Sequence, residues 1–161
     1  MFSKQKWTIA LIVFAGVGGM MSRVHPFGDL RTTQESNNPL LGGAEVPPEV
    51  RGMIEQKCAD CHSQRTAWPA YSRIPPISWL IERDVHRGRD HMDLSHWQQY
   101  SFEEQQDLLQ RIASESRSGA MPPAQYTLIH RGAKLPPQEA QQIYEWAKGE
   151  RKRLKTGEEK R

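Results

Sequence analysis

The sequence predicts an all-α protein built around one small folded domain. The chain has 161 residues, and a single domain commonly has about 100–200. No segment alternates apolar and polar residues for long enough to indicate a strand, whereas apolar residues recur at helical spacing in four places. Paired prolines separate these places, and proline fits the first turn of a helix but disrupts later turns.

The first 23 residues predict an export segment. Lysines precede a stretch without charge from Trp7 to Ser22, which is typical of the apolar part of a signal sequence. A cleavage site of small residues is poorly formed, because Met20 and Met21 follow the glycine pair. We therefore expect an uncleaved signal anchor over 1–23 that holds the domain at the periplasmic side of the inner membrane. The alternative is a cleaved signal peptide and a soluble periplasmic protein.

Two further segments carry no helical period. Residues 24–47 include a run rich in Gly, Pro and Asn, which predicts a linker. Residues 149–161 are almost purely charged after Gly149, which predicts a flexible, solvated tail. The folded domain is therefore expected over 48–148.

Four helices are expected within this domain, and local signals mark their ends. Pro48, Pro76 and Pro137 begin three of them, and the capping box Ser101-Phe-Glu-Glu104 begins the third in chain order. The last three are expected to end near Gly88, at Gly119 and at Gly149. The apolar residues that mark the four faces are Val50, Ile54 and Cys58; Ile77, Leu80, Ile81 and Val85; Leu108, Leu109 and Ile112; and Ala140, Ile143, Tyr144 and Ala147.

The charge distribution argues against a nucleic-acid partner. The whole chain has a net charge of +3, but its bases concentrate in the first 23 and the last 14 residues. Residues 24–147 contain 12 bases and 16 acids. A nucleic-acid module carries a basic stripe on its folded domain, and this domain is mildly acidic instead.

The chain's two cysteines lie together in Cys58-Ala-Asp-Cys61-His62. This is the C-x-x-C-H attachment motif of c-type haem. Thiols three residues apart lie on one side of a helical turn, so each can add across one vinyl group at the same edge of a porphyrin. The adjacent histidine can then bind the iron axially. The motif therefore predicts one haem c, attached through Cys58 and Cys61, with His62 as a ligand.

Other uses of a thiol pair fit this chain less well. A zinc site needs four ligands, and only one thiol pair is present. A thioredoxin-like redox pair needs a βαβ context, which a helical chain lacks. A disulfide or dithiol site stays the alternative, although such close spacing strains a bridge and closes only a small loop.

Met121 is the expected sixth ligand of the iron. It lies in Gly119-Ala-Met-Pro-Pro123, where a following proline favours an extended loop with a projecting side chain. Ligation by His and Met raises the reduction potential and suits an electron carrier. His91, His130 and an open or water-bound iron stay as alternatives, and a lone methionine can also simply fill a gap in a core.

Aromatic and basic side chains follow the attachment motif closely. An apolar ring with two propionates requires flat apolar surface and hydrogen-bond donors, which tryptophan and tyrosine combine. Ordinary core packing explains each of these aromatic residues equally well. The candidates for haem contact are Trp68, Tyr71, Arg73 and Trp79.

The second ring nitrogen of His62 is expected to donate a hydrogen bond that fixes the imidazole. The carbonyl groups around Ile74, Pro75 and Pro76, which follow the histidine by 12–14 residues, are the predicted acceptors. Pro76 is therefore included among the residues of the haem site.

A longer pattern accompanies the haem motif. The chain reads CADCHS, then TAWPAYS, PISWL, GR and MPPAQY, and over residues 28–148 it resembles the bacterial haem-binding domain family. That resemblance implies a cytochrome c-like domain with a single covalent haem on an exported, often N-terminally anchored protein. It also implies His62 and Met121 on the two sides of the iron, and a first helix near Gly52 packed against the last near Tyr144 and Trp146.

These features predict a one-electron carrier that exchanges electrons with redox partner proteins. We expect a carrier rather than an enzyme, because no acid–base pair is evident and His/Met ligation leaves no vacant position for a substrate. One alternative is a peroxidase-like enzyme with an open distal face and His91 or His130 as a distal base. Another is a haem sensor or an accessory subunit of a membrane redox complex.

Overall fold

The computed structural model describes residues 4–31 and 38–160. Over these residues the regular elements are helices and no strand is present, which confirms the all-α prediction. The cytochrome c-like arrangement around a haem stays a prediction. The elements in chain order are α1 (Lys4–Met21), α2 (Pro48–Lys57), α3 (Ala59–His62), η1 (Ala70–Arg73), α4 (Ile77–His91), η2 (Leu94–Gln99), α5 (Phe102–Ser118), α6 (Ala124–Ile129), η3 (Arg131–Ala133) and α7 (Pro137–Glu158).

The four helices expected in the domain are present as α2, α4, α5 and α7, although α4 continues three residues past Gly88 to His91. At the start of α5, Ser101 Oγ accepts from the backbone N–H of Glu104, and the Glu104 carboxylate accepts from the N–H of Ser101. This confirms the capping box. Gly119 ends the same helix in the left-handed conformation at φ +75°, as a C-terminal glycine commonly does.

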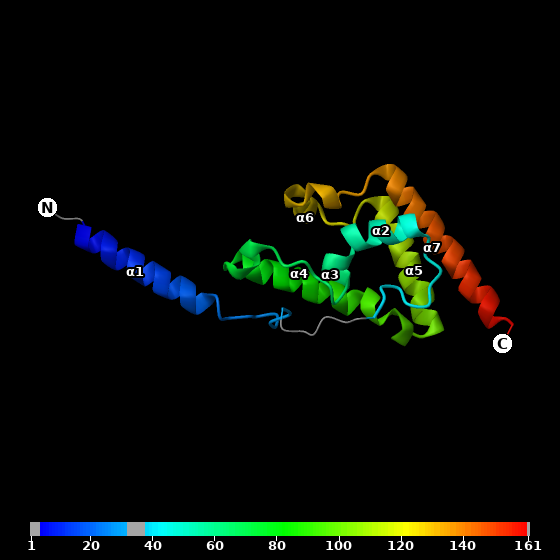
Figure 1. The fold of residues 1–161 in the computed structure, drawn as a ribbon, viewed down its shortest axis with the longest axis horizontal. Coiled ribbons are helices and arrows are strands. Elements are labelled where there is room, and N and C mark those ends of the chain that lie inside the picture. Colours follow the sequence, from blue (N-terminus) through cyan, green and yellow to red (C-terminus); the bar gives the residue numbers. More distant parts are fainter. Residues whose placement is uncertain (1–3, 32–37, 161) are drawn as a thin grey trace.

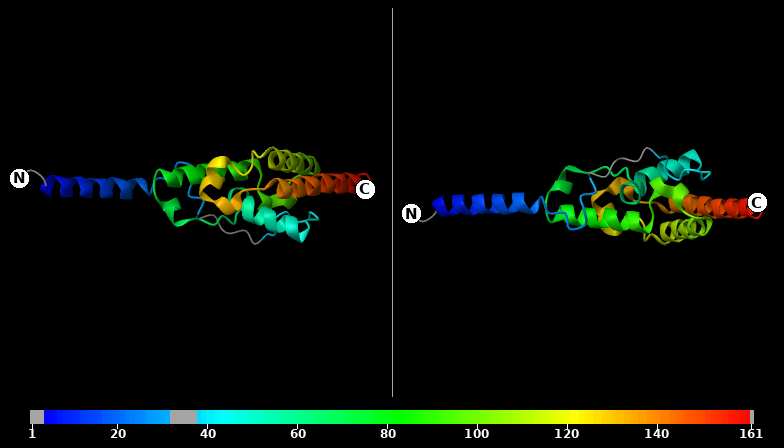
Figure 2. Two further views of the ribbon diagram at one scale, coloured as in Figure 1. Left: turned by 90° about the horizontal axis from the view of Figure 1, so that it is seen from above. Right: turned by 90° about the horizontal axis from the view of Figure 1, so that it is seen from below.

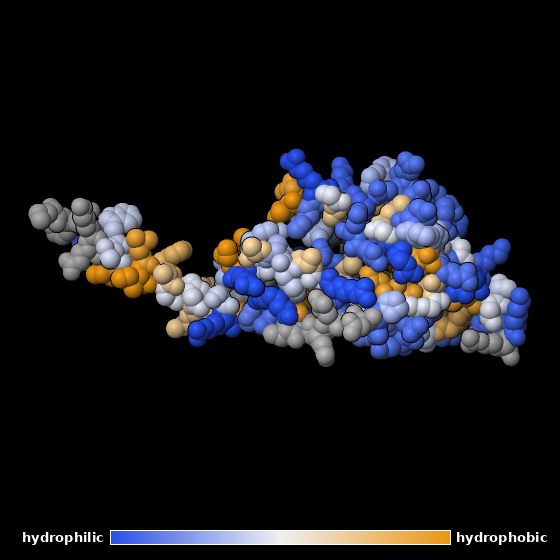
Figure 3. Space-filling model, viewed as in Figure 1, coloured by the Kyte–Doolittle hydropathy of each residue, from blue (hydrophilic) through white to orange (hydrophobic). Residues whose placement is uncertain are grey.

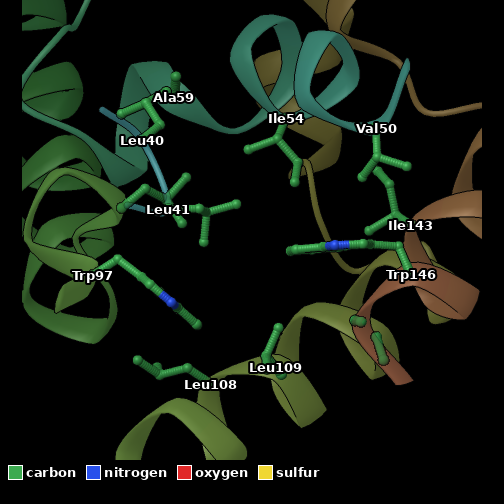
Figure 4. Packing of buried hydrophobic residues seen from close by; sticks show 13 residues of the cluster. Leu40, Leu41, Val50, Ile54, Ala59, Trp97, Leu108, Leu109, Ile143 and Trp146 are labelled. Carbon is green, nitrogen blue, oxygen red and sulfur yellow. The ribbon is translucent and has the colours of Figure 1, made fainter. Parts of the chain in front are cut away.

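The core lies between α2, α5 and α7. The last two helices run antiparallel, side by side, and α2 crosses them (Figures 1 and 2). In Figure 4, Val50 and Ile54 of α2 lie next to Ile143 and Trp146 of α7. This confirms the expected packing of the first domain helix on the last one. Trp97, Leu108 and Leu109 close the core on the side of η2 and α5.

The predicted linker contributes to this core. Leu40 and Leu41 are only 3% and 2% exposed, and the Leu41 N–H donates to the Leu94 carbonyl at 2.9 Å. The interpretation of residues 24–47 as a plain linker is therefore wrong at this leucine pair. Burial there follows from tertiary contacts with η2, which a segment without a period cannot reveal.

The predicted flexible tail is also wrong over residues 150–158. α7 continues past Gly149 to Glu158. The Glu150 side chain is buried and accepts hydrogen bonds from the Arg153 guanidinium and from the Glu45 N–H. Leu154 packs against the core. Apart from Glu150, most of the charged residues lie on the outward face of a helix whose inner face still packs.

α1 projects away from the rest of the chain (Figures 1 and 2), and its apolar side chains, such as Leu11 and Phe14, are exposed. In the described parts of the chain, no helix combines the length and apolar character needed to cross a membrane. The export or anchor function of residues 1–23 stays a prediction.

Candidate functional site

The attachment motif forms a short helix of its own. α2 ends at Lys57, and Cys58 lies between the two helices at φ −120° and caps the N-terminus of α3. The Cys58 carbonyl accepts from the N–H groups of Cys61 at 3.2 Å and His62 at 3.0 Å. Both cysteines are half-buried and free. The two thiols and the imidazole thus come from one turn, as the motif predicted.

Burial keeps both thiols protonated. It raises the pKa of Cys58 to about 12, with a further contribution from Cys61, and the pKa of Cys61 to about 11, with further contributions from the Asp60 and Asp84 carboxylates. Addition of a thiol across a vinyl group places sulfur on one carbon and hydrogen on the other. The protonated thiols therefore carry every atom that thioether formation needs.

His62 is fixed by the end of α4. Its Nδ1 lies 3.1 Å from the carbonyl oxygen of Met92, the C-cap residue of that helix. Donation from Nδ1–H to this carbonyl leaves Nε2 as the nitrogen that can bind a metal. Burial lowers the pKa of His62, which favours the neutral, ligating form.

The predicted acceptors for this hydrogen bond, the carbonyl groups around Ile74, Pro75 and Pro76, are wrong. Those residues precede α4, and the acceptor lies at the opposite end of the same helix. The last carbonyl groups of a helix have no intrahelical partner, so they are available to a neighbouring imidazole.

A glycine allows α4 to approach this closely. A Cβ atom at Gly88 would lie 2.4 Å from the carbonyl oxygen of Cys61, which is far inside van der Waals contact. One residue further along α4, the Arg89 guanidinium donates to the Ser63 carbonyl at 2.9 Å and to Thr66 Oγ1 at 3.1 Å. α4 therefore contacts both the attachment turn, residues 58–62, and the segment that follows it.

Met121 lies in the loop between α5 and α6, as predicted. Its N–H donates to the Glu115 carbonyl at 3.2 Å, and Met121 as a whole is 39% exposed. Met92, in contrast, is partly buried against the core. Met121 is thus the more exposed of the two methionines, and its ligation to iron stays a prediction.

α6 connects this loop to the attachment turn. The Tyr126 hydroxyl donates to Asp60 Oδ2 at 2.6 Å, and the Tyr71 hydroxyl lies 2.6 Å from His130 Nε2. The Tyr126 and His130 rings stack with centroids 4.4 Å apart and planes 14° apart. Asp60 and Tyr126 were not among the predicted site residues, although both belong to quoted motifs: Asp60 to CADCH and Tyr126 to MPPAQY.

The other predicted contacts are more dispersed. The Trp79 indole N–H donates to the Val24 carbonyl at 2.7 Å, and the Arg31 guanidinium lies 5.9 Å from the centre of a Trp68 ring. Arg73 is exposed on η1, and Pro76 is exposed as the N-cap residue of α4. Haem contact by any of these four residues stays a prediction.

Exposed apolar side chains lie on α6, on the N-terminal half of α4 and just before α4. In Figure 1, α6 and the N-terminal half of α4 both extend to the left of α3, and Figure 3 shows hydrophobic surface near the outer ends of both. A compact protein exposes few contiguous apolar patches without a partner for them. The exposed residues are Ile74, Ile77, Leu80, Leu128 and Ile129.

The residues present therefore fit a haem. Two protonated thiols share a turn, the neighbouring imidazole is oriented through Nδ1, a glycine gives the turn its tight support, and uncovered apolar surface lies beside it. A sequence model of the family described as "Haem-binding domain" matches residues 17–149. No curated protein and no solved structure matches the chain.

Proposed function

This chain belongs to the haem-binding domain family, and we propose that it carries one covalently attached c-type haem and transfers single electrons. The observation that supports this most directly is the geometry of residues 58–62, where two free thiols precede a histidine whose Nδ1 is bound to the Met92 carbonyl. A bound haem would supply an iron that changes its charge by one electron.

Each residue of the site has a distinct task in this proposal. The Cys58 and Cys61 thiols would hold the haem through thioether bonds, whose formation consumes no external oxidant. His62 would offer Nε2 as an iron ligand, because Nδ1 is engaged. Met121 would offer its thioether as a second protein ligand, and a soft ligand favours the reduced metal and a higher potential. The expected partners are redox proteins that exchange single electrons with this site.

Electron transfer fits the site better than peroxidase chemistry. A distal base needs an imidazole nitrogen free to accept a proton from a bound substrate. In this structure His130 Nε2 is hydrogen-bonded to the Tyr71 hydroxyl, and His91 lies exposed at the end of α4. The His130 nitrogen is thus already engaged and is not free for that role.

The proposal includes a periplasmic location. Its support is the two lysines followed by the charge-free run from Trp7 to Ser22, together with covalent haem attachment, which suits an exported protein. A fusion of alkaline phosphatase after Arg161 should be active in intact cells. Inactivity of that fusion, with fluorescence of the matching cytoplasmic reporter, would contradict the location.

The ligation can be tested with two volume-conserving variants. Met121→Leu should abolish the weak charge-transfer band that a ferric iron–methionine bond produces, and it should lower the midpoint potential. Met92→Leu is the matched control, because it removes the other nearby thioether and keeps the backbone carbonyl that orients His62. An unchanged spectrum in Met121→Leu would contradict the His/Met carrier.

Covalent attachment has a separate test. Haem should remain with the wild-type chain through acid–acetone extraction and should be lost from the double variant Cys58→Ala/Cys61→Ala. Extraction of all haem from the wild type would show that the thiols serve another purpose.

A further inference from the structure

α6, the helix that directly follows the Met121 loop, has no core of its own. It contains six residues, none of them buried, and Leu128 and Ile129 are 78% and 67% exposed. A helix this short is unstable by itself in water. Its position must therefore depend on the few polar and ring contacts that it makes with the rest of the domain.

Those contacts lead to the attachment turn. Tyr126, in the middle of α6, donates to Asp60 Oδ2 at 2.6 Å. Just after the helix, His130 is bound to the Tyr71 hydroxyl at 2.6 Å and stacks on the Tyr126 ring. The two hydrogen bonds are thus coupled through one pair of stacked rings.

The acceptor Asp60 is itself held in place. Its Oδ1 accepts from the Ala67 N–H at 2.9 Å, and its backbone carbonyl accepts from Thr66 Oγ1 at 2.6 Å. Both carboxylate oxygens are therefore engaged, one with the chain after the motif and the other with Tyr126. Asp60 lies directly before Cys61, so the Tyr126 bond joins α6 to the haem-attachment turn itself.

The segment between Met121 and Tyr126 transmits this restraint. It contains Pro122 and Pro123, whose rings fix φ and limit the freedom of the loop. On its other side, the Met121 N–H is bound to the Glu115 carbonyl of α5. The methionine is therefore held between α5 and a residue anchored to Asp60.

We propose that Tyr126 and Asp60 are positioning residues for the axial methionine: their hydrogen bond holds the Met121 loop against the turn that carries the haem. The inference rests on the proposed His/Met ligation. It gives a positioning role to Asp60, the second variable residue of the C-x-x-C-H motif, and to Tyr126, which follows the Met-Pro-Pro sequence.

The test is the affinity of the full-length, haem-loaded ferric protein for imidazole, which competes with the methionine. Tyr126→Phe removes one hydroxyl and keeps the ring that stacks on His130. Loss of a hydrogen bond to a charged acceptor commonly changes an equilibrium by about tenfold or more. We expect imidazole to bind on the order of tenfold more tightly, and the iron–methionine band to weaken. Tyr144→Phe, which removes the same atom from α7, should leave both unchanged.

A double-mutant cycle separates positioning from general loosening. Asp60→Ala should raise the imidazole affinity as Tyr126→Phe does, and the double variant should match the single variants rather than add to them. Covalently bound haem per chain is measured for each variant as a check on attachment. Tyr71→Phe, which cuts the second contact of α6, should raise the affinity as well and serves if Asp60→Ala fails to fold.

The outcomes distinguish this inference from the proposed function. If the wild type shows the methionine band but Tyr126→Phe and Tyr71→Phe keep the wild-type affinity for imidazole, the positioning role is overturned and the ligation stands. Additive effects in the cycle would overturn the Tyr126–Asp60 bond as the cause. If Met121→Leu leaves the spectrum unchanged, the ligation and the positioning role are both wrong.

Discussion

Gly88 shows how one missing side chain shapes this site. The backbone of α4 passes so close to the attachment turn that a Cβ atom at residue 88 would meet the Cys61 carbonyl oxygen at 2.4 Å and its carbon at 2.9 Å. Both contacts are with backbone, which cannot swing aside as a flexible side chain would. The same approach brings the Met92 carbonyl to His62, so the orientation of the imidazole depends on this glycine.

Gly88→Ala is therefore expected to destabilise the protein and to displace the Met92 carbonyl. Overpacking commonly costs about 1–3 kcal/mol, and a backbone clash of this size should reach the upper part of that range despite the better helix propensity of alanine. Guanidinium unfolding of the haem-loaded protein measures the loss. Gly52→Ala is the matched control, because nothing lies within 4 Å of a Cβ atom there. Equal stability of the two variants would contradict the close approach.

At the scale of elements, the charged C-terminal part of α7 is structural. Glu150 accepts from Glu45 and Arg153, the Arg151 carbonyl accepts from the Gln106 amide, and Leu154 packs against the core. These contacts connect α7 to α5 and to the segment before α2. They explain why the helix does not end at Gly149.

Deletion of residues 149–161 should lower the free energy of unfolding by about 2–4 kcal/mol, from lost hydrogen bonds and lost apolar burial. Deletion of residues 157–161 removes only exposed positions among those described and should change it by less than about 0.5 kcal/mol. Thermal unfolding followed by circular dichroism compares the two. If neither deletion changes the free energy of unfolding from that of the full chain, the contacts of residues 149–156 do not stabilise the protein.

Helices with an apolar period and clear end signals could be predicted from the sequence. Pro48 and Pro137 are at first-turn positions, and Ser101 caps α5. α3 and α6 are too short to display a period, and their places depend on contacts such as Tyr126 with Asp60. Cys58, Cys61 and His62 could be predicted directly, because all three lie within five consecutive residues of one motif.

What the sequence could not reveal are contacts between distant segments. The Met92 carbonyl is found 30 residues after His62, and a backbone acceptor leaves no mark on residue identity. Leu40 and Leu41 are buried by η2 without any period of their own. The charged residues after Gly149 hide the inner face of this part of α7, because a stretch in which Glu150 and Leu154 turn inward among charged residues resembles a solvated tail.

At the scale of the whole molecule, the segment that follows α1 is fastened to the domain. The Val24 carbonyl accepts from Trp79, and the Arg31 guanidinium donates to the Ser72 carbonyl at 2.9 Å and to the Glu82 carboxylate at 2.9 Å. His25 Nδ1 lies 2.7 Å from the same carboxylate oxygen. Glu82 on α4 is fully buried, so its charge requires these partners. α1 is thus connected to α4 through ordered chain.

Arg31→Ala should release this segment. Breaking a buried ion pair by removing one partner commonly costs about 3–5 kcal/mol; His25 remains near Glu82, so we expect a loss of about 2–3 kcal/mol. Chymotrypsin should cleave after Phe27 faster than in the wild type.

Arg83→Ala is the control, because Arg83 pairs with Asp84 at a surface where both side chains are about one third exposed, and such pairs contribute about 0–1 kcal/mol. The variant Arg31→Ala/Glu82→Gln should recover part of the lost stability, because it removes the uncompensated charge and keeps the shape of the side chain. If the double variant is no more stable than Arg31→Ala, the buried charge of Glu82 is not what fastens the segment.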